Sequence, residues 1–202
     1  MAEENRKHSV NAGHYATVAD FKRIFTEDVN SLYLLSLVLT GDPVKAEQCF
    51  VEGIGESTKG NHVFKEWARS WARRTIIQSA IRLVNPRQLS TTGIRSVDVA
   101  RMLDKVPIVL HTEVCAILEL APFDRFVFVL SMLEHYSDND CSILLSCTRK
   151  EIAPTRTRAV QRLVTLLRLE DNGRTNTIPE TAIELLITQH FAKPFWSQGL
   201  SR

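Results

Sequence analysis

The fold is decided by residues 136–167, which read YSDNDCSILLSCTRKEIAPTRTRAVQRLVTLL. The apolar run at residues 143–145 predicts a short helix, and a tight Ser-Cys-Thr link follows at residues 146–148. Thr148 can cap a second helix, because Glu151 stands three residues further on in the pattern of a capping box. A short helix, a tight turn and a second helix are typical of a helix-turn-helix.

The second helix of this pair is amphipathic and basic. Its apolar residues recur at helical spacing, at Ile152, Ala159, Leu163 and Leu166. Its basic residues fall mostly on the other faces, at Arg149, Lys150, Arg158 and Arg162. In a helix-turn-helix the front of the second helix enters the DNA major groove, while arginines and lysines neutralise phosphates. A plain solvent-exposed basic face is the alternative interpretation.

Because of Pro154, the sequence allows two positions for the start of the second helix. If this helix starts at Arg149, Pro154 lies inside it and removes the hydrogen bond to the Lys150 carbonyl, at a cost of roughly 3 kcal/mol. The alternative is a separate turn over residues 148–153, with the long helix starting at Pro154. The two alternatives present different residues to a DNA groove.

The charge of the chain is segregated, although its total is small. The 202 residues are 44% hydrophobic and 24% charged with a net charge of +2, which is typical of a globular protein with a core. One basic segment, residues 63–88, carries Lys65, Arg69, Arg73, Arg74, Arg82 and Arg87 against Glu66. The other, residues 149–168, carries Arg149, Lys150, Arg156, Arg158, Arg162 and Arg168 against Glu151. This distribution predicts two contacts with a polyanion.

The sequence gives no support for an enzyme or a metalloprotein. The four cysteines form no CxxC pair and the six histidines are dispersed, so no metal site is expected. Nucleotide-binding and hydrolase motifs are missing, so we expect no cofactor and no small-molecule substrate. The polar N-terminus and the lack of a long apolar run predict a cytoplasmic protein with reduced thiols and no membrane partner.

The other periodic segments also have helical spacing. Residues 18–40 predict an amphipathic helix with a break near Glu27. Asp42 can cap the next helix, with Pro43 at its first position. Residues 63–83 predict one long helix that carries the first basic segment.

The expected fold class is therefore all-α, with two small helical domains joined by a linker. The domains are expected at residues 18–84 and 112–170, with the linker at residues 85–111. Residues 1–17 are expected to be a disordered tail, and residues 171–202 a C-terminal helix (179–191) and tail.

Both halves of the chain resemble a bacterial sigma factor of the sigma-70 family, of the extracytoplasmic-function type. The region-four-like text is LAPFDR at 120–125, VFVL at 127–130, YS at 136–137, SCT at 146–148 and Arg158-Ala159 through Leu163. The region-two-like text is LTGDP at 39–43, Ala46-Glu47, and FKEWARSWAR at 64–73. The resemblance covers roughly residues 20–168, with both halves in the family's order.

This resemblance implies a promoter-recognition subunit that acts with core RNA polymerase and has no catalytic activity of its own. It assigns polymerase binding to Ala46, Glu47, Gln48 and Glu52. It assigns opening of the minus-ten element and binding of its non-template strand to Lys59, Asn61, Lys65, Trp67, Arg69, Arg73 and Arg74. It assigns duplex promoter binding to Thr148, Arg149, Lys150, Thr155, Arg156, Arg158 and Arg162. Core polymerase and promoter DNA are the expected partners, with an anti-sigma factor as a further one.

Trp67 and Trp71 allow two interpretations. They stand four residues apart, and separated bases need such aromatic surfaces together with cationic groups. Aromatic residues at this spacing also form buried helix faces, and for both tryptophans we favour the buried interpretation.

The sequence departs from the family's pattern at several positions, and these leave an alternative function. Gln48 and Val51 replace the usual Asp and Gln, and Ser146 replaces the glycine of the turn. Ala153 and Thr155 stand where a basic residue is usual. The alternative is a sigma-like protein that binds a regulator without supporting initiation.

Overall fold

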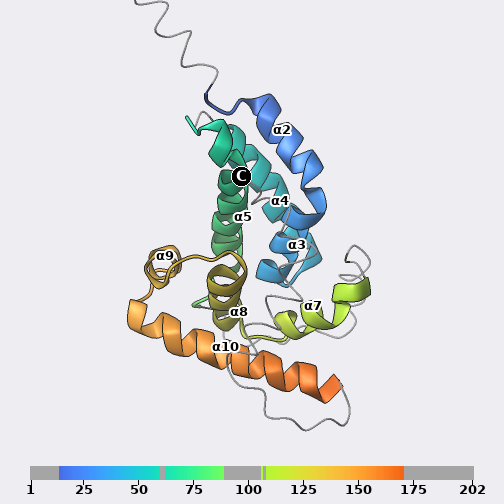
Figure 1. Ribbon diagram of the computed structural model, residues 1–202, viewed down its shortest axis with the longest axis vertical. Coiled ribbons are helices and arrows are strands. Elements are labelled where there is room, and N and C mark those ends of the chain that lie inside the picture. The colour runs from blue at the N-terminus through green and yellow to red at the C-terminus, as the bar shows by residue number, and fades with distance from the viewer. Residues whose placement is uncertain (1–13, 60–61, 89–105, 107, 171–202) are drawn as a thin grey trace, which may run out of the picture.

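The structure is a computed structural model of the chain, and it describes residues 14–59, 62–88, 106 and 108–170 (Figure 1). Every regular element in these residues is helical, which confirms the all-α class. The described residues add only an isolated antiparallel bridge between Tyr15 and Phe64. None of the described helices has the length and apolar character needed to cross a membrane.

In the first group of helices, capping side chains mark the starts of α2 (Val18–Glu27) and α4 (Pro43–Thr58). The group also comprises α3 (Val29–Thr40), the short turn η1 (Lys65–Trp67) and α5 (Ala68–Val84). Thr17 and Asp20 form a capping box at the start of α2. Asp42 accepts hydrogen bonds from the backbone N–H groups of Val44 and Lys45 at 2.8 and 3.0 Å. The break near Glu27 and the Asp42 cap are therefore confirmed.

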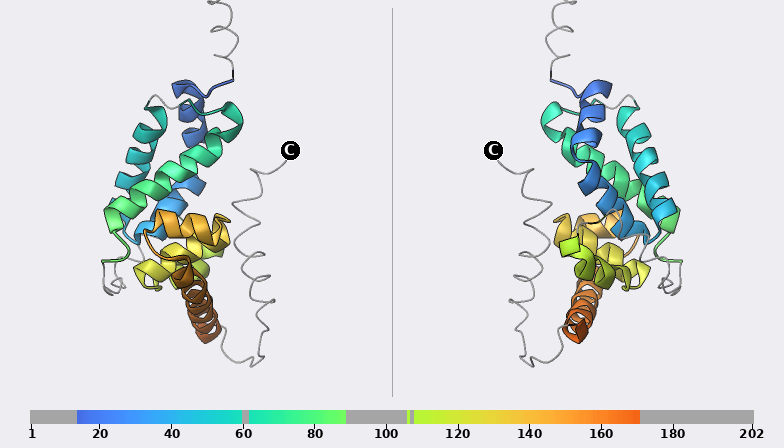
Figure 2. Two further views of the ribbon diagram at one scale, coloured as in Figure 1. Left: turned by 90° about the vertical axis from the view of Figure 1, so that its left-hand side faces the viewer. Right: turned by 90° about the vertical axis from the view of Figure 1, so that its right-hand side faces the viewer.

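The second group contains the predicted helix-turn-helix. It comprises η2 (Ile108–Leu110), α7 (His111–Leu118), α8 (Pro122–Phe128), the wide turn η3 (Val129–Leu133), α9 (Asp138–Leu144) and α10 (Arg149–Glu170). Figures 1 and 2 show α10 at one end of the long axis of the molecule and the start of α5 toward the other. The basic segment 63–88 therefore starts toward the end opposite α10, whereas Arg87 near its C-terminal end pairs with Glu151 on α10.

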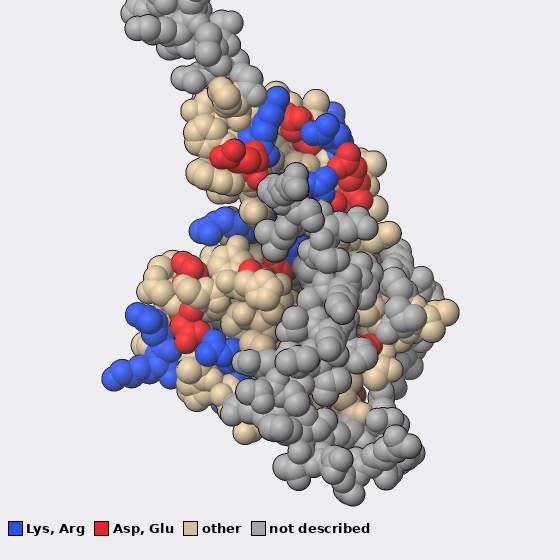
Figure 3. Space-filling model, in the orientation of Figure 1, with Lys and Arg blue, Asp and Glu red and all other residues tan. Residues whose placement is uncertain are grey.

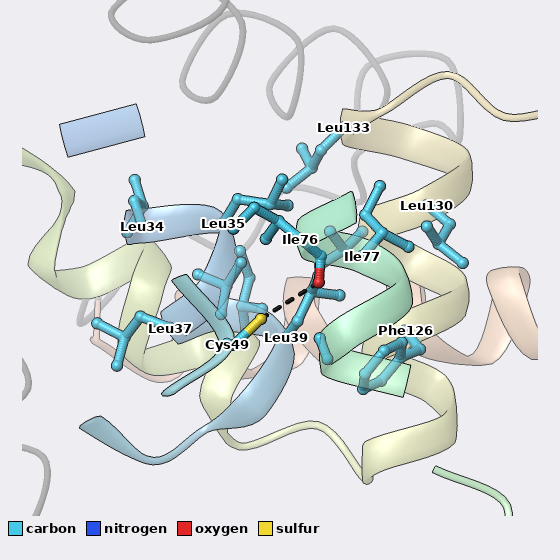
Figure 4. Packing of buried hydrophobic residues seen from close by; sticks show 14 of the residues in the cluster. Leu34, Leu35, Leu37, Leu39, Cys49, Ile76, Ile77, Phe126, Leu130 and Leu133 are labelled. Atoms are coloured by element: carbon cyan, nitrogen blue, oxygen red, sulfur yellow. Dashed lines mark hydrogen bonds between the residues drawn. The ribbon is translucent and has the colours of Figure 1, made fainter. Parts of the chain in front are cut away.

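The two groups of helices share one contiguous hydrophobic core. Helix α3 packs against α7 and α8 as well as against α4 and α5. Figure 4 shows the centre of this core, where Leu35, Ile77 and Phe126 are fully buried. The Cys49 thiol donates a hydrogen bond to the Ile76 carbonyl at 3.2 Å, and burial raises its pKa to about 12. Cys49 is therefore a structural residue of the core.

Two predicted boundaries differ from the structure. Residues 14–17 were expected in a tail, but Ala16 N–H donates to the Val63 carbonyl at 2.7 Å and Thr17 caps α2. The helix predicted from Val63 starts only at Ala68, because the chain around Phe64 is extended and pairs with this N-terminal segment. The predicted helix at 179–191 and most of the predicted linker lie outside the described residues.

Candidate nucleic-acid interface

Helices α9 and α10 and the link between them form the first half of the candidate interface. Ser137 caps α9 by accepting a hydrogen bond from Asp140 N–H at 3.1 Å. Ser146 has φ +51°, the left-handed conformation for which the family's pattern uses glycine. Cys141, Leu145 and Ile152 are buried between the two helices and the rest of the core. The described chain therefore has a tightly linked helix pair at this position.

Hydrogen bonds to Glu151 fix the start of α10. The position of this start decides between the two alternatives for the helix that contains Pro154. The Glu151 carboxylate accepts hydrogen bonds from Thr148 N–H at 2.7 Å and Thr148 Oγ1 at 2.8 Å. These two bonds hold the pKa of Glu151 below its usual range. One continuous helix starts at Arg149 and carries Pro154 inside it, with the proline ring exposed. The separate-turn alternative is wrong.

The front of α10 presents an exposed basic surface. Arg149 and Lys150 are exposed, as is Arg162 two turns beyond Pro154, and no carboxylate among the described residues lies within ion-pairing distance of these three. Ala153, Pro154 and Thr157 complete the exposed face. Figure 3 shows basic side chains projecting from this end of the molecule. The arrangement suits contact with a polyanion.

Three other residues predicted to contact DNA are engaged within the protein. The Thr155 side chain is only 4% exposed and belongs to the core face, so its prediction as a DNA contact is wrong. Arg158 Nε donates to Asp124 on α8 at 2.9 Å. Arg156 pairs with Asp138 at the start of α9. These two arginines hold α10 against its neighbours, and DNA would have to compete for them.

The second half of the candidate interface is a row of aromatic rings at the other end of the molecule, where α5 begins. The row consists of Tyr15, Phe64 and Trp67, with His62 beside Tyr15. Trp67 is 59% exposed and Phe64 is 37% exposed. The buried interpretation is therefore wrong for Trp67, whereas Trp71 is half-buried and packs against the core. Exposed rings of this kind can stack on unpaired bases.

The cations near the aromatic row differ in how far they are engaged in ion pairs within the protein. Lys65 is exposed between Phe64 and Trp67 in the sequence, and Lys59 is exposed with its ammonium 2.9 Å from Glu56. Arg69 forms ion pairs with Glu27 and Asp28 across the α2–α3 break. Asn61 lies outside the described residues. Lys65 is the cation best placed to meet a strand on the aromatic row.

Arg73 and Arg74 face the second group of helices instead. Arg73 bonds to the Glu134 carboxylate and to Ser31 Oγ. Arg74 lies beside the hydroxyl of Tyr136, whose pKa burial raises above its ordinary value although this guanidinium opposes the shift. In this arrangement both arginines belong to the contact between the two groups of helices. Their use in DNA binding would require that contact to open.

The predicted polymerase-binding residues lie on α4, but not all on its exposed face. Ala46 is fully buried, so its prediction as a contact residue is wrong in this arrangement. Gln48 is exposed and donates to Glu52 Oε1 at 3.0 Å. Val44 and Val51 are 72% and 67% exposed on the same helix. Glu47 is exposed as well. The outer surface of α4 is therefore partly apolar, which suits a protein partner.

Arg125 ties the two groups of helices together and was not selected from the sequence as a structural residue. It is 4% exposed, and burial lowers its pKa to about 10, which leaves it charged at neutral pH. Its guanidinium donates to the Leu118 carbonyl at 3.1 Å and to the Leu39 carbonyl at 3.3 Å. Both carbonyls lie near helix C-termini, where a cation is favourable.

The sequence reasoning also missed Tyr15 and His62. Tyr15 lies in a polar segment without apolar periodicity, so no local pattern indicated that it would meet Phe64. No group of three or more possible metal ligands occurs in the described part of the chain. Comparison of the chain with protein-family models, with curated proteins and with solved structures finds no match.

Proposed function

We propose that this protein is a sigma-type initiation factor that binds core RNA polymerase and directs it to promoter DNA. The observation that carries the proposal is the exposed front of α10, where Arg149 and Lys150 follow a tight left-handed turn at Ser146. A helix in this setting can enter the major groove with its N-terminal residues against base edges. The matched family text in both halves of the chain supports the same function.

In this proposal the two ends of the molecule bind different forms of the promoter DNA. The front of α10 binds the duplex upstream, and Arg162 contacts a phosphate. The exposed rings of Phe64 and Trp67 bind unpaired bases, with Lys65 beside the backbone of that strand. The outer face of α4 binds polymerase through Gln48 and the exposed Val44 and Val51.

Promoter binding through Arg73 and Arg74 requires a change in the arrangement of the two groups of helices. Arg73 contacts Glu134 and Arg74 contacts Tyr136, so each guanidinium already has a partner within the protein. A ligand that binds the separated groups better than the closed ones would shift the equilibrium toward separation. Polymerase is that ligand in the proposal.

The experiment that tests the proposal is selection of DNA sequences by the complex of this chain with bacterial core polymerase, followed by transcription from the selected DNA. Arg149→Ala should change the selected sequence and cost about 1–3 kcal/mol at one position. Arg162→Glu should weaken binding to all sequences and reduce the salt dependence. Lys22→Glu, on the exposed side of α2, is the control and should change neither. No selected sequence and no transcription would contradict the proposal.

A second candidate function is a regulatory interaction module with a sigma-like sequence. The observation that favours it is the engagement of Arg69, Arg73 and Arg158 in intramolecular ion pairs, because these pairs give the basic segments a structural role. This candidate predicts that the chain binds polymerase or another protein through α4 but that the complex starts no transcription. The same experiment therefore separates the two functions.

A further inference from the structure

The chain before α2 is held across the start of the aromatic row by two backbone hydrogen bonds. Ala16 N–H donates to the Val63 carbonyl at 2.7 Å, and Lys65 N–H donates to the His14 carbonyl at 2.9 Å. These bonds make Tyr15 and Phe64 a directly opposed antiparallel pair. The Tyr15 side chain therefore has a fixed position relative to Phe64.

The rings of the row are in contact one after another. Tyr15 stacks on Phe64 with ring centroids 4.9 Å apart and planes inclined by 25°. Phe64 meets Trp67 edge to face, with centroids 5.3 Å apart and planes inclined by 85°. His62 meets Tyr15 edge to face at 5.3 Å. Each of these geometries is a favoured one for aromatic pairs.

This order of contacts gives the three rings different roles. Trp67, at 59% exposure, is the ring most open to a ligand, whereas Tyr15 is half-buried against Phe64. Removal of the Tyr15 ring would uncover one face of Phe64 and leave it free to rotate. Trp67, the last residue of the short turn η1, would then lose its fixed neighbour, because its ring contacts Phe64.

We infer that Tyr15 is a positioning residue of the single-strand-binding surface, and that it acts by holding Phe64 and Trp67 in the orientation that stacks on bases. This inference rests on the proposed function and deepens it at the same site. The N-terminal segment is then part of the binding surface and not an accessory to it. Stacking on rings tolerates any base, so the contribution of Tyr15 is independent of base sequence.

The test measures binding of a labelled single-stranded oligonucleotide and of a selected duplex by the complex of the full chain with core polymerase. Removal of an aromatic ring on which a base stacks is expected to weaken single-strand binding by about 5- to 150-fold, and we expect Trp67→Ala to fall in this range. Tyr15→Ala should weaken it about tenfold and Tyr15→Phe should restore it, since the phenyl ring keeps the stack. Duplex binding should be unchanged in all three variants.

His14→Ala is the matched control, because its side chain is exposed and outside the row while its carbonyl remains in place. It should bind the single strand like the wild type. Wild-type affinity in Tyr15→Ala, together with weakened binding in Trp67→Ala, would overturn the role of Tyr15 and leave the proposed function standing. Equal loss in Tyr15→Phe and Tyr15→Ala would also overturn it. A wild-type complex that binds neither DNA would overturn the proposed function and this inference together.

Discussion

Arg73 on α5 donates from Nε to one carboxylate oxygen of Glu134 at 2.8 Å and from a terminal nitrogen to the other. The Glu134 side chain is only 5% exposed and the Arg73 side chain 22%. The wide turn η3 brings Glu134 to this position, since its N–H donates to Val129 five residues earlier. One partly buried bidentate ion pair therefore joins the two groups of helices that the sequence assigned to separate domains.

The Arg73–Glu134 pair should behave as a coupled unit. Glu134→Ala should lower the free energy of unfolding by about 2–3 kcal/mol, because it leaves a partly buried guanidinium without its charged acceptor. The double variant Arg73→Ala with Glu134→Ala should lose less than the sum of the losses in the single variants Arg73→Ala and Glu134→Ala. Urea denaturation measures all three values. Additive losses would show that the pair does not link the two groups.

Gly41 and Gly55 offer a matched test of how closely the Arg125 side chain packs against Gly41. Gly41 has φ +65°, and a Cβ there would lie 2.8 Å from a terminal nitrogen of Arg125, so Gly41→Ala should lower stability by more than about 1 kcal/mol. At Gly55, in the last turn of α4, a Cβ would meet nothing within 4 Å, so Gly55→Ala should raise stability by about 0.5–1 kcal/mol. Thermal unfolding of the two variants measures both signs. Equal effects at the two glycines would contradict the packing of Arg125 against Gly41.

Pro154→Ala should stabilise the protein by up to about 3 kcal/mol, because α10 continues through this position and alanine restores the hydrogen bond to the Lys150 carbonyl. The proline ring is exposed, so its removal creates no cavity. Thermal unfolding and helix content by circular dichroism measure the effect. A loss of stability would instead indicate that Pro154 starts a helix, where proline is favoured.

The cap at Thr148 should make stability depend on acid pH. Hydrogen bonds from Thr148 hold the folded-state pKa of Glu151 below its ordinary value of 4.5. A depressed carboxyl pKa contributes stability that is present above the unfolded-state pKa and is lost as pH falls through the folded-state pKa. The difference in urea midpoint between wild type and Glu151→Gln should therefore shrink as pH falls from about 6 to about 3. A constant difference over this range would show that the carboxylate charge does not support the cap.

The helices were predictable because their signals are local. Asp42 with Pro43 marks the start of α4, and the spacing of Ile152, Ala159 and Leu163 marks the buried face of α10. Thr155 was assigned to DNA from its place in a family pattern, whereas its three-residue distance from Ile152 puts it on the same buried face.

The tertiary contacts were not predictable from the sequence alone. Tyr15 and Phe64 lie far apart in the chain. Their bridge involves a single residue pair, which leaves no periodic pattern in the sequence from which it could be predicted. The partners of Arg73 and Arg125 depend on how α3, α5 and α8 meet, which local patterns do not encode. The same limit explains why the shared hydrophobic core of the two groups of helices was not expected.

Co-purification of the chain with bacterial core RNA polymerase tests the central claim most directly. Val51 is 67% exposed on α4, so Val51→Arg should fold normally and abolish the complex, while the wild type should co-purify in equal amounts with the core enzyme. Val29→Arg, at a 43% exposed position on α3, is the matched control and should still bind. Failure of the wild-type chain to bind core polymerase would contradict the proposal that it is an initiation factor.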